Sequence, residues 1–515
     1  MSEKVVVRFA PSPTGYLHLG SARTGLYNYI FARRHGGTFI LRIEDTDLSR
    51  STDEAIAQIV SSLREMGLAW DEGPEAPGPH GPYRQTERQH VYHQYIERLL
   101  AAGHLYPCFC TSEELEAERR QAQAEKRAWV YGGTCRDLPR DESERRMGAG
   151  EPWTLRFRLL PGTTVFDDML RDPVEFDNAT IGDFIVQRSD GTVTYNLAVV
   201  VDDVTMEITH VIRGDDHLSN TPKQIVIYQA LGAPVPRFLH MPMLFGTDRK
   251  KLSKRHGATK LEQLTAMGLL VEVVRNYLCF LSTEFDESMI AWTLDDLVQK
   301  FDVEKLGTSA SIFDPDKLRW MNGRFIRLLS DGEIGERLLL YLERVGFFGD
   351  PARVSDLASE GPVALAAVVD AEEEIAHLTP TAPTPEQAAL VRAVAPLVRE
   401  KIDLLAEFIP MAGFFFRPLE IGGEALERLR ATPEAARVLR ESAVRLAALD
   451  EWTVAAVEAV VRALPVDLEA KSKAVFAALR LGMSGQTVTP GLFESLWVLG
   501  QDEAVGRLTA AAALL

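Results

Sequence analysis

The sequence predicts an α/β fold built on a doubly wound parallel sheet, which is interrupted by an insertion of different character and followed by a helical region. Strand, loop, helix and strand patterns succeed one another within the first 45 residues. The alternation resumes near residue 191, and from about residue 260 the apolar residues recur at helical spacing. With 46% hydrophobic and 25% charged residues among 515, the composition excludes disordered and fibrous proteins.

The first strand–helix–strand unit lies at the N-terminus. A buried strand is predicted at 5–10 (VVVRFA) and a turn-rich loop at 11–20. Apolar residues then predict a helix from Ser21 to about His35, and a second strand follows at 38–45. This order is typical of a crossover between two parallel strands. Further helices are predicted at 53–66 and 87–102.

A segment of different composition and predicted secondary structure separates the two halves of the α/β pattern. Between about 107 and 190 the chain carries a cysteine pair, a charged helix at 112–127, Gly-rich turns and short strands. After it, 194–203 and 206–214 are predicted to be strands and 221–232 a helix with Pro in its first turn. We therefore expect an inserted domain within one sheet.

The C-terminal half is predicted to be almost entirely helical. Thr384 and Thr432 are each followed by Pro and Glu, which is the pattern of a capping hydroxyl with Pro at the first helical position. Amphipathic Ala/Leu/Arg runs follow both.

The net charge of −18 argues at first sight against a nucleic-acid partner, whose binder is usually basic. The charge is unevenly distributed, however. Residues 1–40 sum to +4 and residues 241–260 to +5, so two basic islands lie in an acidic chain. An acidic remainder can repel non-specific RNA while the islands bind their partner.

Localisation follows from what the sequence lacks. No window holds about 18 consecutive apolar residues, and the N-terminus has no signal-peptide organisation. Four cysteines in 515 residues do not form a disulfide framework. We expect a cytoplasmic protein with no membrane association.

Two segments have the composition of anion-binding loops. PSPTGYLHLG (11–20) connects a strand to a helix, and the N-terminus of that helix would attract phosphate, with His18 as a hydrogen-bond donor. KLSKR (251–255) places three cations among small and polar residues. Taken alone, each pattern is also compatible with an ordinary turn or a solvated face.

Together these segments resemble the HIGH and KMSKS signatures of class I aminoacyl-tRNA synthetases, in the bacterial glutamyl branch. They occur in the family's order, about 230 residues apart, with an insertion between them. Further matching motifs are RIEDTD (42–47), GPYRQTER (81–88), YNLAVVVDD (195–203), VIRGDDH (211–217) and FDPDKLRWMNG (313–323).

The resemblance implies a glutamate–tRNA ligase that uses ATP with Mg²⁺ and acts on L-glutamate and tRNA(Glu), as a monomer. It implies a Rossmann-type catalytic domain, with catalytic residues at His18, Gly20, Lys251, Ser253, Lys254 and Arg255. The ATP site would comprise Pro11, Thr14, Gly15, His18, Gly20, Ser21, His217, Leu252 and Lys254.

The same resemblance implies a glutamate site. Arg8, Arg213 and the Tyr195 hydroxyl would read the γ-carboxylate, because a guanidinium matches the geometry of a carboxylate. Glu44 would hold the α-ammonium group, and Ser12 belongs to the same set. The sequence departs from the family at Val199, where some relatives carry Asn. A valine cannot make the hydrogen bond of an Asn, so one contact to the substrate's α-carboxylate is not assigned.

Cys108, Cys110 and Cys135 resemble the zinc ligands in the insertion of some family members. The fourth position is Asp137, where relatives often carry His, and Tyr131 is a competing oxygen donor. The alternative is a set of buried thiols that holds no metal.

The helical region resembles the family's anticodon-binding bundle. Lys401, Arg480, Thr489, Pro490 and Leu492 correspond to its anticodon segment. Lys401 stands where an Arg is typical of enzymes that discriminate at the anticodon, and the two side chains read a base edge differently. Whether tRNA(Gln) is also charged is therefore open.

The family organisation implies five segments. These are two catalytic halves at 1–106 and 191–259, an inserted acceptor-binding domain at 107–190, a stem-contact domain at 260–330, and an anticodon-binding region at 331–515 with subdomains at about 331–410 and 411–515.

Four other protein classes share some of these features. Small-molecule nucleotidylyltransferases share the His-x-Gly loop but are much shorter. Glutaminyl-tRNA synthetases have a different opening segment and a β-barrel tail, and the tRNA-modifying paralogue has no anticodon region. A non-catalytic tRNA-binding paralogue would be expected to lose His18 or Lys254, and both are present.

Overall fold

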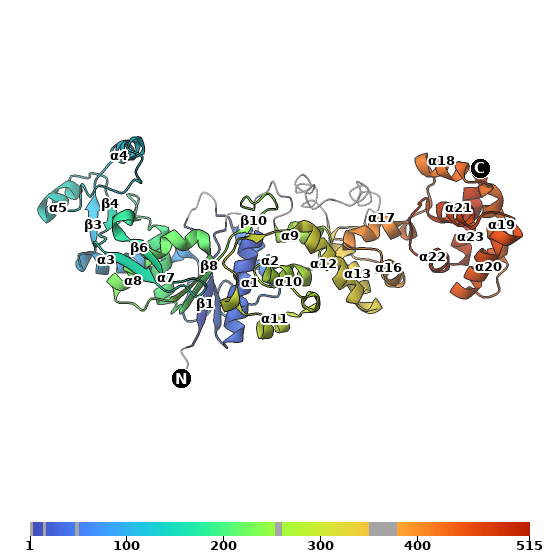
Figure 1. Ribbon diagram of the computed structural model, residues 1–515, viewed down its shortest axis with the longest axis horizontal. Helices are drawn as coiled ribbons and strands as arrows, with labels where there is room; N and C mark the ends of the chain where they lie inside the picture. The colour runs from blue at the N-terminus through green and yellow to red at the C-terminus, as the bar shows by residue number, and fades with distance from the viewer. Residues whose placement is uncertain (1–3, 14–16, 47–50, 253–259, 350–378) are drawn as a thin grey trace. The chain divides into compact units, whose positions relative to one another are not determined.

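The computed structural model describes residues 4–13, 17–46, 51–252, 260–349 and 379–515. The chain forms two compact units. The first comprises Met1–Leu252 and Arg275–Phe313, and the second comprises Ser253–Val274 and Asp314–Leu515. Figure 1 shows the elements of each.

A four-stranded parallel sheet lies at the centre of the first unit, in the order β2-β1-β8-β9. Its strands are β1 (Val6–Phe9), β2 (Thr38–Leu41), β8 (His210–Gly214) and β9 (Arg237–Met241). Strands far apart in sequence pair side by side, since β1 lies between β2 and β8. The prediction of a parallel α/β sheet is therefore confirmed.

Helices flank this sheet in two groups. The helices of the first unit are α1 (Leu19–Arg34), α2 (Asp53–Glu65), α3 (Gln89–Ala101), α7 (Tyr195–Thr205), α8 (Thr221–Leu231) and α11 (Leu294–Lys300). Helix α10 (Val271–Phe280) contains residues of both units. Helix α1 packs on β1, β2, β8 and α11, whereas α7 packs against α3 and α8. The predicted N-terminal helices are confirmed to within a few residues.

The strand predicted at 194–203 is wrong, because this segment forms helix α7. Five consecutive residues, Leu197 to Val201, are each 0 or 1% exposed. A segment that is buried on all sides carries no polar face, and apolar periodicity cannot then distinguish a helix from a strand. The strand predicted at 206–214 is confined to β8.

The insertion contains its own sheets, as Figure 1 shows around β3 and β4. An antiparallel sheet joins β3 (Leu105–Cys108), β4 (Thr154–Phe157) and β7 (Phe184–Gln187), and β5 (Thr163–Phe166) pairs with β6 (Val174–Asp177). The helices here are α4 (Ser112–Ala124), α5 (Arg140–Gly148) and α6 (Asn178–Ile181).

The second unit is helical throughout its described residues, as predicted. Its helices are α9 (Leu261–Ala266), α12 (Pro315–Leu328), α13 (Asp331–Arg344), α16 (Pro385–Val398), α17 (Phe408–Ala412), α18 (Gly423–Ala431), α19 (Ala435–Ala447), α20 (Val454–Asp467), α21 (Ser472–Ser484), α22 (Leu492–Leu499) and α23 (Gln501–Ala513). Two short strands interrupt the helical pattern after residue 240 in the first unit, β10 (Leu244–Phe245) and β11 (Ser311–Ile312).

Of the two predicted helix starts, one is confirmed and the other is wrong. Thr384 caps α16, where its hydroxyl accepts a hydrogen bond from the backbone N–H of Gln387. Thr432 instead follows α18, and its hydroxyl donates to the carbonyl of Arg428. A Ser/Thr hydroxyl can bond back to a carbonyl four residues earlier, so the same residue type can also end a helix.

Within the described residues, no helix has the length and apolar character that crossing a membrane requires.

Candidate active site

The site begins where β1 ends and α1 starts. His18 is the residue that precedes α1, with an extended backbone (φ −70°, ψ 152°), and its side chain is exposed. A Cβ atom placed on Gly20 would meet no atom within 4 Å, so open space lies beside the first turn. The first N–H groups of a helix have no partner within the helix itself, so a helix start of this kind can bind an anion.

The other predicted ATP-site residues are only partly described. Ser12 is exposed, Pro11 is buried, and Ser21 and Leu252 are half-buried. Lys251 is exposed and lies 3.9 Å from the carboxylate of Asp216, measured from Nζ to Oδ2. Thr14, Gly15, Ser253, Lys254 and Arg255 lie outside the described residues.

Each of the four parallel strands delivers one polar side chain to the same face at its carboxyl end. Side chains alternate along a strand, so Arg8 shares its face with Val6, Arg213 with Val211, and His240 with Phe238. These three apolar residues belong to one core cluster with α7 and α8. Arg42 continues the same alternation from Ile40, which also belongs to this cluster.

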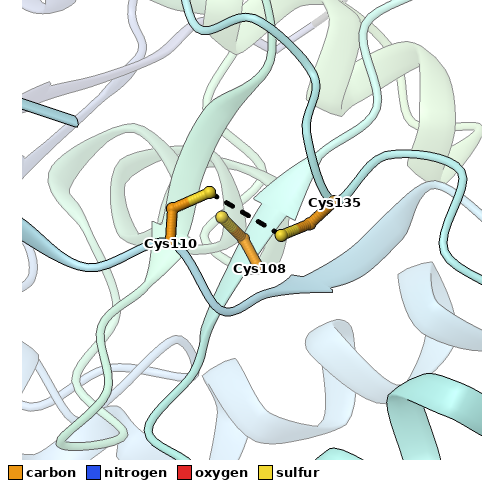
Figure 2. A group of neighbouring side chains, drawn as sticks. All are labelled: Cys108, Cys110 and Cys135. Carbon is orange, nitrogen blue, oxygen red and sulfur yellow. Dashed lines mark hydrogen bonds between the residues drawn. The ribbon is translucent and has the colours of Figure 1, made fainter. Parts of the chain in front are cut away.

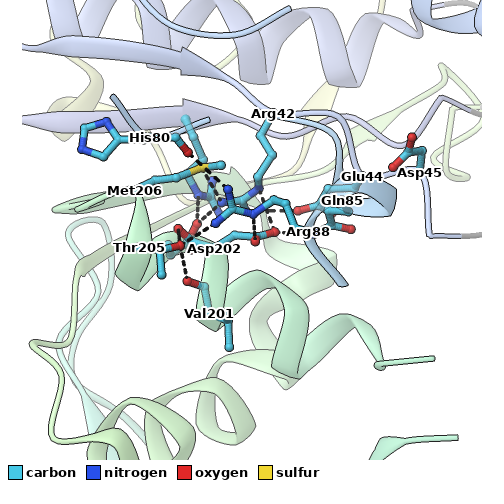
Figure 3. Close-up of polar contacts among 12 residues, drawn as sticks. Arg42, Glu44, Asp45, His80, Gln85, Arg88, Val201, Asp202, Thr205 and Met206 are labelled. Atoms are coloured by element: carbon cyan, nitrogen blue, oxygen red, sulfur yellow. Dashed lines mark hydrogen bonds and ion pairs between the residues drawn. The ribbon is translucent and has the colours of Figure 1, made fainter. Parts of the chain in front are cut away.

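Arg42 is the centre of a buried ion-pair network, shown in Figure 3. Its side chain is 0% exposed, and its Nη1 lies 2.6 Å from Oδ1 of Asp203. Its Nη2 lies 3.2 Å from Glu44 and its Nε 3.7 Å from Asp202. Asp202 also pairs with Arg88, at 2.6 Å. Buried charges require such partners, because each one loses its hydration.

Arg8 and Glu44, two predicted glutamate-site residues, both join this network. The Nε of Arg8 donates to Oδ1 of Asp203 at 3.1 Å. Burial raises the pKa of Glu44, and the positive charge of Arg42 opposes that shift. Both side chains are therefore held in place by ion pairs.

Arg213 is bound differently. It is 5% exposed, and its Nη2 donates to Oγ1 of Thr221 and Oε1 of Gln224, both at 2.8 Å. Its Nε donates to Nε2 of His240 at 3.2 Å. Its Nη1 has no hydrogen-bond partner, and no carboxylate of the described residues pairs with it. Burial lowers its pKa. A desolvated guanidinium in this state has a strong affinity for an anion.

Tyr195 and His217 lie beside this guanidinium. The Tyr195 hydroxyl is 3.0 Å from Nδ1 of His217. Burial raises the pKa of Tyr195, and the charges of Arg213, Glu44 and Arg8 also act on this hydroxyl. Burial and the nearby Arg213 lower the pKa of His217 to about 4, so its imidazole is neutral at pH 7. The structure thus brings four of the predicted glutamate-site residues together, namely Arg8, Glu44, Tyr195 and Arg213.

Sequence reasoning missed four charged or titratable groups of this site, Arg42, Asp203, Asp168 and His240. Two signals could have found Asp203, Arg42 and His240. Asp203 is the second of two acidic residues that follow the apolar run 197–201, and charges so placed need buried partners. Arg42 and His240 extend the alternation of apolar strands in the same way as Arg8 and Arg213.

Comparison with known proteins agrees with this arrangement. Residues 4–320 match the catalytic domain of the class I tRNA synthetases (E and Q), and residues 369–512 match an anticodon-binding domain. The chain belongs to the class I tRNA synthetases. The confirmed family accounts for the parallel sheet, the insertion and the helical C-terminal region described above.

Relatives within this family align over nearly the whole chain. A glutamate–tRNA ligase 2 from Rubrobacter xylanophilus is 42% identical, with 98% of this chain and 97% of the relative covered. A glutamate–tRNA ligase from Moorella thermoacetica is 41% identical, with 99% and 98% covered. A solved glutamate tRNA ligase from Elizabethkingia meningosepticum, in complex with its amino acid, has a TM-score of 0.79 at 28% identity and 99% coverage of both chains.

The insertion of this synthetase holds three thiols in one cluster, which Figure 2 shows. The sulfur atoms of Cys108, Cys110 and Cys135 all lie within 4.8 Å of one another, and those of Cys110 and Cys135 are 3.7 Å apart. In a tetrahedral zinc site with Zn–S bonds of about 2.3 Å, two sulfurs lie about 3.8 Å apart. The cluster therefore has the dimensions of a zinc site.

Tyr131, and not Asp137, completes this cluster. The Tyr131 hydroxyl lies 3.4 Å from the sulfur of Cys108 and 3.5 Å from that of Cys110. Asp137 is exposed, and its carboxylate pairs with Arg158 at 3.1 Å. The expectation that Asp137 is the fourth ligand is not supported, because this side chain is exposed, pairs with Arg158 and does not belong to the group formed by the three thiols.

The predicted anticodon residues also converge, although they come from separate segments of the second unit. The Nζ of Lys401 donates to the carbonyl of Thr489 at 2.9 Å. Burial and the charge of Arg480 lower the pKa of Lys401. Pro490 and Leu492 are buried, so they support this loop from within. Lys401 is therefore hydrogen-bonded to the loop at Thr489, a residue that the sequence placed with it in the anticodon segment.

Proposed function

We propose that this synthetase is a glutamate–tRNA ligase, which activates L-glutamate with ATP and transfers it to the terminal adenosine of tRNA(Glu). The observation that carries this proposal is Arg213, a buried guanidinium with an unpartnered Nη1 and no carboxylate partner among the described residues. A substrate γ-carboxylate would supply that partner. Glutamine would leave the guanidinium charge unpaired, which is costly in a dry site.

Several side chains would orient the amino acid. The charges of Arg8 and Arg213 both act on the Tyr195 hydroxyl. Ser12 is exposed near the start of the loop that follows β1. Glu44, fixed by Arg42, would hold the α-ammonium group. Val199 is 1% exposed and apolar, so its side chain adds no contact to the α-carboxylate.

The first chemical step would be an in-line displacement. An oxygen of the glutamate α-carboxylate attacks the α-phosphorus of ATP, a P–O bond forms, and the bond to pyrophosphate breaks. Such a step depends on positioning and charge stabilisation. His18 and the N–H groups near Gly20 would contact the phosphates, and by the family resemblance Lys254 would do so from the basic segment.

The second step would transfer the acyl group. A hydroxyl of the terminal adenosine attacks the activated carbonyl carbon and gives up its proton to the departing phosphate group. An ester bond forms, and AMP leaves with the electrons of the cleaved C–O bond. Mg²⁺ would arrive with ATP and neutralise its phosphates. Among the described residues only the three thiols form a group of metal-ligand type, so we assign no protein cluster to Mg²⁺.

We further propose that the insertion binds the acceptor end of the tRNA. A cavity of about 470 Å³ lies beside β4 and β7. Three cations at this cavity stand over aromatic rings, namely Arg119 over Trp129, Arg156 over Tyr131 and Lys223 over Phe184. Cations and aromatic faces together suit an unpaired nucleotide, which offers a phosphate and a base.

The thiol cluster would hold one structural Zn²⁺, bound by Cys108, Cys110 and Cys135 with the Tyr131 oxygen as a fourth donor. When bound, the ion would tie β3 to the loop that precedes α5 and so stabilise the insertion. This proposal rests on the sulfur separations given above.

We propose a monomeric, cytoplasmic enzyme. All four cysteines are free thiols, as is usual in a reducing compartment. The second unit would read the anticodon through the segment around Lys401 and Thr489, which the hydrogen bond between them holds together.

Aminoacylation with [¹⁴C]glutamate tests the function, using purified tRNA(Glu) and tRNA(Gln) in parallel. We expect charging of tRNA(Glu). Charging of both would establish a non-discriminating enzyme, which Lys401 in place of Arg leaves open. Absence of charging with either tRNA, in a preparation that still binds tRNA, would overturn the proposal in favour of a non-catalytic tRNA-binding protein.

A further inference from the structure

Arg213 differs from the other buried guanidinium groups of the site in what holds it. Arg8 and Arg42 are both paired with the carboxylate of Asp203, at 3.1 and 2.6 Å. Arg213 donates only to neutral acceptors, the Nε2 of His240, the Oγ1 of Thr221 and the Oε1 of Gln224. Neutral acceptors fix the orientation of a guanidinium and leave its charge uncompensated.

One of these acceptors depends on a particular state of His240. This imidazole is 0% exposed and is the register partner of Arg213 across β8 and β9. Because an Arg nitrogen can only donate, His240 must present the lone pair of Nε2 to it. The ring proton then has to lie on Nδ1. A protonated or Nε2–H imidazole would place two donors, Nε2 and the Nε of Arg213, against each other. Oγ1 of Thr221 also lies 3.0 Å from Nε2, and its hydroxyl donates to the carbonyl of His217 at 3.2 Å.

Asp168 supplies the reason for that state. Its Oδ2 lies 2.6 Å from Nδ1 of His240 and also accepts the backbone N–H of His240 at 3.1 Å. The carboxylate therefore requires a proton on Nδ1. Its own side chain is fully buried, and its Oδ1 accepts the backbone N–H of Leu170 at 3.0 Å, so it is fixed from both sides.

We propose that Asp168 and His240 are positioning residues for the substrate's side-chain carboxylate. Asp168 holds His240 in the Nδ1–H tautomer, and His240 in turn orients Arg213 without neutralising it. The negative charge of Asp168 is kept one residue away from the guanidinium, so that the charge of Arg213 remains for the substrate. This inference rests on the proposed role of Arg213 in glutamate binding.

The first test separates the acceptor of His240 from its packing. His240→Leu fills the space beside Phe166 and Phe238 with an apolar side chain and removes the acceptor, whereas His240→Gln retains an oxygen that can accept from Arg213. We expect His240→Leu to raise the KM for glutamate roughly tenfold or more, and His240→Gln to raise it much less. The KM values for ATP and tRNA should change little in both. Equal losses in the two variants, or equal changes in all three KM values, would overturn the proposal.

A double-mutant cycle tests Asp168. Asp168→Ala should raise the KM for glutamate in the wild-type background and add little in the His240→Gln background, because an amide oxygen needs no tautomer. Asp168→Ala also removes the acceptor of two backbone N–H groups, and this loss of stability occurs in both backgrounds. The melting temperature of each variant measures it. Asp167→Asn, at an exposed neighbouring position, is the matched control. Additive effects would show that Asp168 acts only on the fold.

A measurement without activity covers the case in which a His240 variant fails to fold. The ¹⁵N chemical shifts of His240 in the wild-type enzyme should report a neutral ring protonated at Nδ1, and an Nε2–H ring would overturn the proposal. If the proposed ligase function is wrong, the wild-type enzyme will not charge tRNA with glutamate. That result differs from a failure of the positioning role of Asp168 and His240. Normal charging with no effect of Asp168→Ala contradicts the positioning role alone.

Discussion

The guanidinium of Arg42 and the carboxylate of Asp203 form a buried ion pair of 2.6 Å that joins the end of β2 to the last turn of α7. The same carboxylate oxygen also accepts from Arg8, which lies on β1. One acidic side chain thus fixes two cations at the carboxyl end of the sheet. Asp203 belongs to α7, so this helix is tied to both β1 and the end of β2.

Asp203→Ala should therefore destabilise the first unit severely. It would leave two buried guanidinium groups without this partner, and breaking a buried pair typically costs about 3 to 5 kcal/mol. Urea unfolding followed by circular dichroism measures the change. Glu207→Gln, four residues later and exposed, is the control and should leave the unfolding midpoint in place. A loss of less than about 1 kcal/mol for Asp203→Ala would contradict the role given to this pair.

Stability should fall as the pH is lowered from about 6.5 toward 4. Burial lowers the pKa of His217 and of His210 to about 4, whereas a histidine of the unfolded chain titrates near 6.5. Between these values the unfolded state binds more protons, so acid favours unfolding. Unfolding free energies at several pH values should show this slope, and His210→Gln should flatten it. An unchanged slope in that variant, compared with His93→Gln on the exposed face of α3, would contradict the assignment.

Arg213→Ala should abolish most glutamate binding with little effect on ATP. Removing one partner of a buried charge pair costs several kcal/mol, which corresponds to a rise in the KM for glutamate of roughly a hundredfold or more. Arg237→Ala, at the exposed start of β9, is the control. Pyrophosphate exchange at varied glutamate and ATP concentrations separates the two effects, and an equal rise in both KM values would argue against a specific glutamate contact.

Gly20→Ala should weaken ATP binding without loss of stability. The added Cβ meets no protein atom within 4 Å, so the fold tolerates it, and Ala favours a helix over Gly. In the complex the methyl group would occupy space proposed for ATP, and we expect the KM for ATP to rise roughly tenfold. Gly332→Ala is closely matched, since Gly332 also lies in the first turn of a helix with open space beside it. An unaltered KM for ATP would remove Gly20 from the nucleotide site.

Metal analysis of the purified enzyme should find about one zinc per chain. Cys110→Ser should abolish it and lower the melting temperature of the insertion, because a ligand is lost from the thiol cluster. Tyr131→Phe should weaken retention of the ion in the presence of a chelator. Asp137→Asn should retain zinc fully, since this carboxylate pairs with Arg158. Zinc loss in the Asp137 variant would restore the ligand set expected from the sequence.

Local patterns in the sequence were sufficient for a large part of this description. Apolar periodicity located most of the helices, and the helix after the first strand begins at Leu19, two residues before the predicted start at Ser21. The family and the general place of the glutamate site followed from short motifs. Helices, turns and short motifs are determined by residues that are close together in the sequence, so they can be predicted without the tertiary structure.

Tertiary structure alone decided the rest. Helix α7 was mistaken for a strand because its surroundings bury every side. Tyr131 replaced Asp137 beside the thiols, and Asp168 reached His240 from 72 residues away. The sequence also did not show which of Arg8, Arg42 and Arg213 lacks a carboxylate partner. A guanidinium is neutralised or left charged by the groups that the fold brings to it, and for Arg213 these are neutral acceptors from β9 and α8.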